Sequence, residues 1–236
     1  LPDEAILAAH AERALAQGAP EDELTQDVRA GYTGVVAVLR CGEGPTLALR
    51  FDIDALPMAE CPQETHRPTR EGFASVNPGM MHACGHDGHA AIGLGVARIL
   101  MAHRDVLHGT VKLIFQPAEE GVRGAQSIAE SGVLDDVDWF LSGHLGMGWK
   151  TGELLALTNG FLSTTKIDAV ITGLSSHAGA SPQDGHNAIL AACSATLAMH
   201  TACQDSRGAA RLNVGTISGG TGRNVVADRA VLQLET

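Results

Sequence analysis

The chain has 236 residues, of which 44% are hydrophobic, enough for one large domain or two modest ones, each with a buried core. A net charge of −11 and the lack of a Lys/Arg cluster argue against a nucleic-acid partner or an anionic membrane surface. No apolar run approaches the ~20 residues of a membrane span, and the first residues do not resemble a signal peptide.

The cysteines also bear on the compartment of the protein. There are five, an odd number, and they follow no framework spacing. This usage is typical of a protein in the reducing cytoplasm rather than of a disulfide scaffold. We therefore expect a cytoplasmic protein.

Strand-like and helix-like segments alternate through the first two thirds of the chain. Residues 57–80 interrupt them with four of the nine prolines, which indicates a long surface loop. The alternation predicts an α/β domain with a largely parallel sheet. The expected helices are 3–16, 89–101 and 124–131, and the expected strands are 35–39, 47–51, 110–115 and 139–142.

The pattern changes near Ser163. A strand at 165–172 is followed by a helix at 185–202, with Asp184 near its start, and by strands at 212–217 and 230–235. This order predicts a small α+β domain with a helix on one face of an antiparallel sheet. We expect domains at 1–163 and 164–236, with the chain truncated inside the second.

The run Met80–His89 is rich in metal-binding side chains. Cys84 and His86 flank one glycine, so a bent loop could direct both at one zinc-like ion. Asp87 could be the neighbouring carboxylate that orients a histidine. The alternative is a buried free cysteine beside ordinary helix-cap histidines.

Two further strand ends carry possible ligands. Glu119 and Glu120 follow the strand 110–115, and His144 follows the strand 139–142. Open α/β sheets bind their ligands at this edge, where one carboxylate can hold a metal while its neighbour acts as a general base. Taken singly, Glu119 and Glu120 would be interpreted as part of an ordinary solvated loop, and His144 as an ordinary loop histidine. Because three segments supply such groups together, we predict a metal site.

The second domain contributes other polar groups. Ser175-Ser176-His177 lacks the Gly-X-Ser-X-Gly context of a serine nucleophile, so His177 is better interpreted as a polar group directed across a cleft. In the Gly-rich turn 219–224, Arg223 suits a carboxylate and Asn224 a carbonyl oxygen. A hairpin with surface polar residues is the alternative.

Together these strings resemble the M20 metallopeptidase/amidohydrolase family, in particular its aminoacylases, hippurate hydrolases and auxin-conjugate hydrolases. Finer strings, such as His66-Arg67-Pro68, favour a glutamate conjugate, best p-aminobenzoyl-glutamate, as the substrate. The matching segments run in order along nearly the whole chain: Leu49–Pro57, Cys84–His89, Gln116–Gly121, His144, Ser176–Ala178 and Arg223–Val226.

The resemblance implies a catalytic domain with two divalent ions, zinc or manganese, and an inserted lid domain that dimerises. It implies that Cys84, His86, Glu120 and His144 are metal ligands and that Glu119 is the general base. It further implies that His177 stabilises the oxyanion in the partner's active site and that Asn224 helps to bind substrate. The reaction would be hydrolysis of the amide bond of an N-acyl or N-aroyl amino acid.

One departure from the family pattern leaves alternatives open. The family's last metal-ligand histidine, in the returning half of the catalytic domain, has no match before Thr236. The chain could therefore be a non-catalytic fragment or subunit, with a role as a dimerisation or binding module. A zinc carboxypeptidase acting on peptides would share the chemistry. We expect a homodimer through the lid, and a second, related subunit is a further candidate partner.

Overall fold

The computed structural model describes residues 2–146, 148–156, 163–202 and 210–236. It divides into two compact units, residues 1–151 and 152–236. The division falls ahead of the boundary expected at Ser163, and residues 157–162, just before that position, lie outside the described residues.

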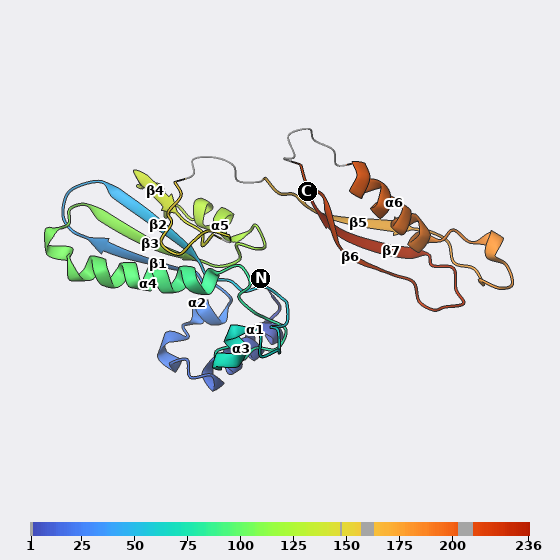
Figure 1. The fold of residues 1–236 in the computed structure, drawn as a ribbon, viewed down its shortest axis with the longest axis horizontal. Helices are drawn as coiled ribbons and strands as arrows, with labels where there is room; N and C mark the ends of the chain where they lie inside the picture. The colour runs from blue at the N-terminus through green and yellow to red at the C-terminus, as the bar shows by residue number, and fades with distance from the viewer. Residues whose placement is uncertain (1, 147, 157–162, 203–209) are drawn as a thin grey trace. The chain divides into compact units, whose positions relative to one another are not determined.

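The first unit is built on a four-stranded mixed sheet (Figure 1). β2 pairs in parallel with β3 and with β4, as expected, whereas β1 pairs antiparallel with β3. β1 and β2 follow each other in sequence but lie on opposite sides of β3, so the short turn between them does not form a hairpin. The strands are β1 (Val35–Arg40), β2 (Thr46–Asp52), β3 (Thr110–Gln116) and β4 (Trp139–Ser142), in the order β1-β3-β2-β4.

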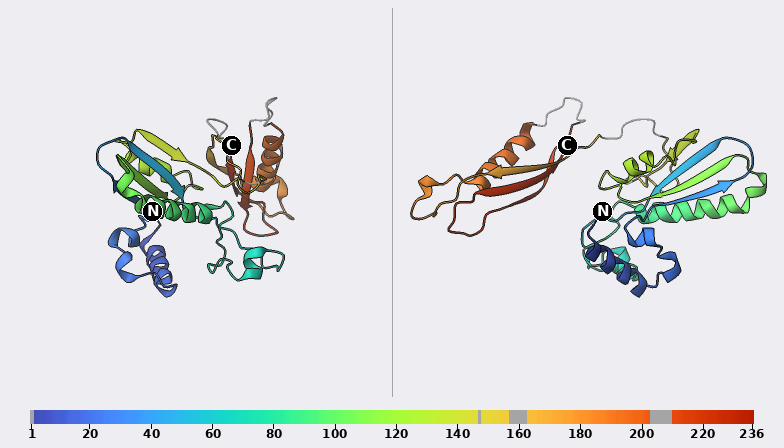
Figure 2. Two further views of the ribbon diagram at one scale, coloured as in Figure 1. Left: turned by 60° about the vertical axis from the view of Figure 1, so that its left-hand side comes forward. Right: turned by 180° about the vertical axis from the view of Figure 1, so that it is seen from behind.

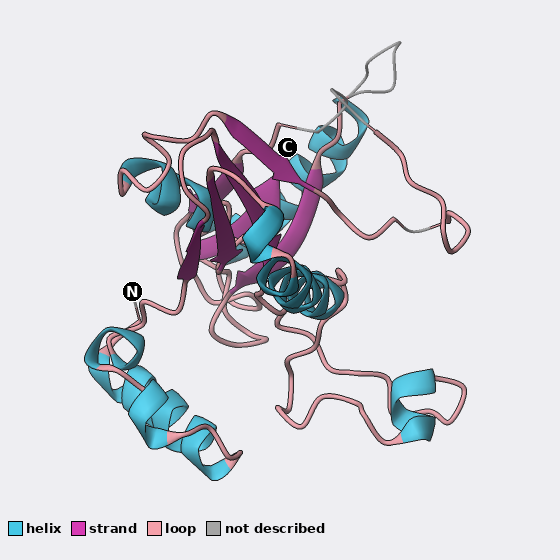
Figure 3. Ribbon diagram, turned by 90° about the vertical axis from the view of Figure 1, so that its left-hand side faces the viewer, coloured by secondary structure: helices cyan, strands magenta, loops and turns pink. Residues whose placement is uncertain are grey.

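The helix α4 (His86–Ala102) lies along one face of this sheet, against β2 and β3 (Figure 3). A Cβ atom on Gly93 would lie 2.6 Å from Phe115 and 2.9 Å from Phe51, so this glycine allows the helix to approach the strands. α4 begins at His86, three residues earlier than expected, because Gly85 turns the chain with a φ of 85°. The run Met80–His89 is therefore helical from His86 onwards.

The remaining helices of the first unit are short or peripheral. The loop expected at 57–80 contains α3, and α5 contacts β3. The segment that carries α3 projects away from the sheet (Figure 2, left). These helices are α1 (Glu4–Ala16), α2 (Gln26–Arg29), α3 (Arg67–Glu71) and α5 (Gly124–Glu130), with 3₁₀ turns at Glu21–Glu23 and Arg104–Val106.

The second unit has the predicted α+β arrangement. β5 (Lys166–Thr172), β6 (Asn213–Gly219) and β7 (Arg229–Glu235) form an antiparallel sheet in the order β5-β7-β6. α6 (Ala188–Ala202) packs on it through a small core of Ala188, Ala192, Ala230, Leu232 and Leu234.

The start of α6 differs from the expectation. Asp184 lies in a 3₁₀ turn (Pro182–Asp184), and the helix begins only at Ala188. The side chain of Asn187 accepts a hydrogen bond from the amide of Leu190 at 3.1 Å, which makes Asn187 the capping residue.

Throughout the described residues, none of the helices has the length and apolar character of a bilayer span.

Candidate metal centre

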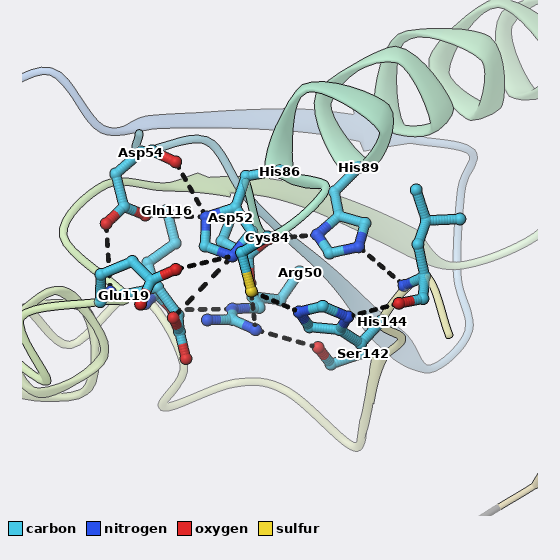
Figure 4. Close-up of polar contacts among 12 residues, drawn as sticks. Arg50, Asp52, Asp54, Cys84, His86, His89, Gln116, Glu119, Ser142 and His144 are labelled. Carbon is cyan, nitrogen blue, oxygen red and sulfur yellow. Dashed lines mark hydrogen bonds and ion pairs between the residues drawn. The ribbon is translucent and has the colours of Figure 1, made fainter. Parts of the chain in front are cut away.

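The carboxyl ends of three strands meet the start of α4 at one place in the first unit (Figure 4). The parallel register sets Asp52 of β2 opposite Gln116 of β3, and Arg50 of β2 opposite Ser142 of β4. The segments that follow these strands therefore lie side by side. They bring together Asp52, Asp54, Cys84, His86, His89, Glu119, Glu120 and His144.

His86 is completely buried at this point. Its Nδ1 donates a hydrogen bond to the carbonyl oxygen of Asp54 at 2.9 Å, which leaves Nε2 as the nitrogen with a free lone pair. That Nε2 lies 3.9 Å from Glu119 Oε2 and 3.9 Å from Glu120 Oε1. The ring is thus oriented as a metal ligand usually is, with its second nitrogen held by the protein.

His144 is oriented in the same way. Its Nδ1 donates to the carbonyl oxygen of Leu145 at 2.8 Å, and its Nε2 lies 3.4 Å from the sulfur of Cys84. The possible ligand atoms of Cys84, His86 and His144 all lie within 4.8 Å of one another, as do those of His86, Glu119 and Glu120. The two groups share His86.

The donor atoms fit a divalent metal ion. His86 Nε2 and Glu120 Oε1 are buried and have no hydrogen-bond partner among the described residues. A buried polar atom without a partner costs roughly 1–3 kcal/mol, so such atoms usually receive a ligand. A set of sulfur, imidazole and carboxylate donors suits zinc, and the carboxylates also tolerate manganese.

Asp52 and Asp54 hold this arrangement, although they are expected from the sequence only as part of the segment Leu49–Pro57 and not as site residues. Besides accepting from His86, Asp54 accepts the amide of Glu120 through Oδ2 at 3.1 Å, so it ties the glutamate loop to α4. Asp52 is hydrogen-bonded to His89 and lies 2.8 Å from Arg50 Nη1. The signal that could have found them is an Asp-X-Asp sequence directly after an apolar strand.

The carboxylate expected beside a ligand histidine was Asp87, and the structure corrects that expectation. Asp87 is exposed in the first turn of α4, whereas its neighbours His86 and His89 turn towards the sheet. The carboxylates that contact the two histidines are Asp54 and Asp52. Helical geometry explains this difference, because adjacent residues on a helix point about 100° apart.

The local charges act on the two acidic groups in opposite directions. Burial, followed by the negative charges of Glu120, Glu119 and Asp52, raises the pKa of the Cys84 thiol to about 11. Burial would also raise the pKa of Asp52, but the hydrogen bond to His89 and the charge of Arg50 outweigh it and hold that pKa below its ordinary value. Without a metal ion, Cys84 is therefore a neutral thiol near pH 7, and Asp52 is a carboxylate.

The loop that carries Glu119 and Glu120 has an unusual backbone. Ala118 and Val122 have φ values of 55° and 54°, in the left-handed region that residues with side chains seldom adopt. A Cβ atom on Gly124 would lie 1.7 Å from the carbonyl oxygen of Pro117, so only glycine fits there. Such strain is often found at functional sites.

In the second unit, His177 lies next to the Arg223–Asn224 turn. His177 and Val225 form an isolated antiparallel bridge, and the amide of Ala178 donates to the carbonyl oxygen of Asn224 at 3.0 Å. The Nδ1 atom of His177 accepts from the amides of Gly179 and Ala180 at 3.1 and 3.0 Å. The proton of the His177 ring is therefore on Nε2. Arg223, in the neighbouring turn, lines a cavity of about 480 Å³.

Comparisons with known proteins agree on one family. A model of peptidase family M20/M25/M40 matches residues 48–221. An indole-3-acetyl-aspartic acid hydrolase from Enterobacter agglomerans is 54% identical over 237 residues, covering 100% of this chain and 54% of the relative. A p-aminobenzoyl-glutamate hydrolase subunit from Escherichia coli K12 is 53% identical over 240 residues, with the same coverage. The chain thus spans about half the length of these relatives.

Solved structures give the same result. An aminobenzoyl-glutamate utilization protein from Klebsiella pneumoniae superposes with a TM-score of 0.72 at 44% identity, covering 100% of this chain and 53% of that one. A Bacillus subtilis protein described as a dinuclear metal-binding peptidase of the M20 family gives a TM-score of 0.55 at 32% identity, covering 86% of this chain and 51% of that one.

Proposed function

This chain belongs to the M20/M25/M40 family of peptidases, and from that premise we propose that it carries the metal centre of an amidohydrolase. The reaction is the hydrolysis of the amide bond of an N-acyl or N-aroyl amino acid. One observation carries the proposal: His86 Nε2 and Glu120 Oε1 are buried and unpartnered among the described residues, and both lie beside Glu119.

Two divalent ions, zinc or manganese, are the proposed cofactors, and Cys84, His86, Glu120 and His144 would hold them. When bound, they would supply Lewis-acid chemistry, polarising the amide carbonyl and lowering the pKa of a water molecule. The overlap of two possible ligand groups at His86, and the dinuclear description of the Bacillus subtilis neighbour, support a two-metal site.

Glu119 is the proposed general base. Its side chain is 39% exposed, compared with 29% for Glu120, and the buried unpartnered oxygen belongs to Glu120. This difference favours Glu120 as the ligand and leaves Glu119 able to reach water and substrate. Glu119 would take a proton from the attacking water and return it to the leaving amine.

The second unit is proposed to be the lid, through which the protein would form a homodimer. His177 has its proton on Nε2, so it can donate a hydrogen bond to the oxygen of a substrate amide as negative charge develops there. We assign this contact to the partner's active site. Arg223 and Asn224 are proposed to bind the substrate, Arg223 through a carboxylate.

The proposed substrate is an acidic amino acid with an aromatic acyl group. Both curated relatives are named for such compounds, one an indole-3-acetyl-aspartate and the other a p-aminobenzoyl-glutamate. We favour p-aminobenzoyl-glutamate, which would give p-aminobenzoate and glutamate.

Because one relative is named as a subunit, a second related subunit is part of the proposal. So is a cytoplasmic location, which suits the free thiols at Cys41, Cys61, Cys84 and Cys193.

A substrate panel tests this function. The protein is expressed from its complete open reading frame, stripped of metal and reloaded with Mn²⁺ or Zn²⁺. Its substrates are p-aminobenzoyl-glutamate, indole-3-acetyl-aspartate and a series of peptides that differ in their C-terminal dipeptide. Release of glutamate or aspartate from the acyl conjugates supports the proposal. Preference for the peptides would favour the zinc carboxypeptidase. The absence of both turnover and metal would favour a dimerisation or binding module.

A further inference from the structure

The backbone of Leu145 connects two histidines of the cluster. Its amide donates to His89 Nε2 at 2.8 Å, and its carbonyl oxygen accepts from His144 Nδ1 at 2.8 Å. His89 therefore holds the backbone amide of Leu145, and the carbonyl oxygen of the same residue orients His144. Nothing in the sequence indicates this link, because the two histidines are far apart along the chain.

His89 is itself held firmly. It is 3% exposed, and because its Nε2 accepts a hydrogen bond, its proton is on Nδ1 and is donated to Asp52 Oδ1. Asp52 is 1% exposed and lies 2.8 Å from Arg50 Nη1, while Arg50 Nε donates to Gln116 at 2.9 Å. Both ring nitrogens of His89 are thus used by protein groups, which argues against its being a metal ligand.

The side chain of Leu145 makes a second, independent contact with α4. A Cβ atom on Gly88 would lie 2.4 Å from Leu145 Cδ1, and one on Gly85 would lie 3.5 Å away. Glycine at position 88 therefore leaves the space that Leu145 occupies. Hydrogen bonding and packing hold the same residue against the same turn of the helix.

We propose that His89, oriented by Asp52, is a positioning residue for the metal centre. It fixes the backbone of Leu145 through the amide, and the carbonyl oxygen of Leu145 keeps His144 Nε2 directed at Cys84 and His86. The inference rests on the proposed function, since it gives His144 a metal to bind. Groups that orient ligands in this way typically change metal affinity about 10- to 100-fold when they are removed.

Two variants of His89 separate its hydrogen bonds. In His89→Gln, the side-chain oxygen can reach the place of Nε2 and accept from Leu145. In His89→Asn, the shorter amide can reach Asp52 but not Leu145. Hydrogen exchange of the Leu145 amide, measured on the 236-residue chain without metal, should stay slow in the glutamine variant and become at least about tenfold faster in the asparagine variant.

Co²⁺ titration then reads out the metal centre. The thiolate-to-cobalt absorption of His89→Asn should match that of His144→Ala, with affinity weakened about tenfold or more, and His89→Gln should resemble the unaltered chain. Gly88→Ala provides a second route if His89→Asn does not fold: it favours the helix, but its methyl group pushes on the end of the Leu145 side chain, so it should give a loss in the same direction.

The results distinguish the inference from the function on which it rests. Unchanged Leu145 exchange and an unchanged cobalt spectrum in both His89→Asn and Gly88→Ala would overturn the inference. If the unaltered chain bound no cobalt, the proposed function would fail, and the exchange rates of Leu145 without metal would still decide whether His89 holds this amide.

Discussion

His86 Nε2 and Glu120 Oε1 lie 3.9 Å apart, and neither has a hydrogen-bond partner among the described residues. An imidazole nitrogen and a carboxylate oxygen at this separation can both bind one cation placed between them. Asp54 fixes both residues through hydrogen bonds. His86 Nδ1 donates to the carbonyl oxygen of Asp54, and the backbone amide of Glu120 donates to the Asp54 carboxylate. The two atoms are thus held in positions from which both could bind one cation.

Metal binding should therefore stabilise the fold. At a free Zn²⁺ concentration about 100 times Kd, the free energy of unfolding should rise by about 2.7 kcal/mol, and the effect should disappear in His86→Ala. Thermal unfolding with and without a chelator measures it. His103→Ala is the matched control, because His103 is exposed at the other end of α4 and should keep the full effect. Equal stabilisation of the His86 and His103 variants would contradict the assignment.

Metal affinity should also rise with pH. The pKa of Cys84 is raised to about 11, so at neutral pH the thiol holds a proton that a metal ion must displace. As pH rises towards that pKa, deprotonating the thiol costs less free energy, so the Kd for the metal should fall about tenfold per pH unit between roughly pH 7 and 9. Isothermal titration in buffers of different ionisation enthalpy counts the released proton.

Two cysteine variants check this slope. Cys84→Ser removes the titrating thiol and should flatten the pH dependence, whereas the exposed Cys61→Ser should leave it unchanged. A slope that persists in Cys84→Ser would show that another group releases the proton.

Ala118 offers a test of the strained glutamate loop. Its φ of 55° costs about 1–2 kcal/mol for a residue with a side chain, so Ala118→Gly should raise the free energy of unfolding by about 1 kcal/mol. Ala125→Gly is the control: it is exposed within α5 and should lower stability by about 1 kcal/mol. Chemical denaturation distinguishes the two, and a loss of stability in both would argue against strain at Ala118.

Gly124 should be intolerant of any side chain. A Cβ atom there would lie 1.7 Å from the Pro117 carbonyl oxygen, so Gly124→Ala must move the loop that carries Glu119 and Glu120. We expect a loss of stability and weaker Zn²⁺ binding. Gly95→Ala in α4 meets no atom within 4 Å and should instead stabilise the chain by up to about 1 kcal/mol. Unfolding curves and zinc titrations of both variants provide the measurement.

The sequence predicts the parts of the site whose positions depend on where individual strands end. Apolar runs locate the strand ends and so predict that Glu119, Glu120 and His144 meet Cys84 and His86, and the structure brings them together. The antiparallel pairing of β1 with β3 was not predictable, because it depends on which strands become neighbours.

The supporting residues depend on three-dimensional contacts. Asp52 reaches His89 only because α4 begins at His86 and turns His89 towards β2. Adjacency in the sequence favours Asp87 as the carboxylate beside a ligand histidine, yet helical geometry points its side chain outwards. Similarly, Asn187 and not Asp184 caps α6, because Asp184 belongs to the 3₁₀ turn Pro182–Asp184 and His186 pairs with Leu174 before the helix begins.

The most direct test of the central claim is turnover by Glu119→Gln, measured alongside its metal content. Glutamine keeps the shape of the side chain but cannot accept a proton, so release of glutamate from p-aminobenzoyl-glutamate should fall at least about 100-fold. Metal bound per chain, measured by mass spectrometry, should stay at the level of the unaltered protein. Full activity in Glu119→Gln with unchanged metal content would contradict the role of Glu119 as the base of a metal-dependent amidohydrolase.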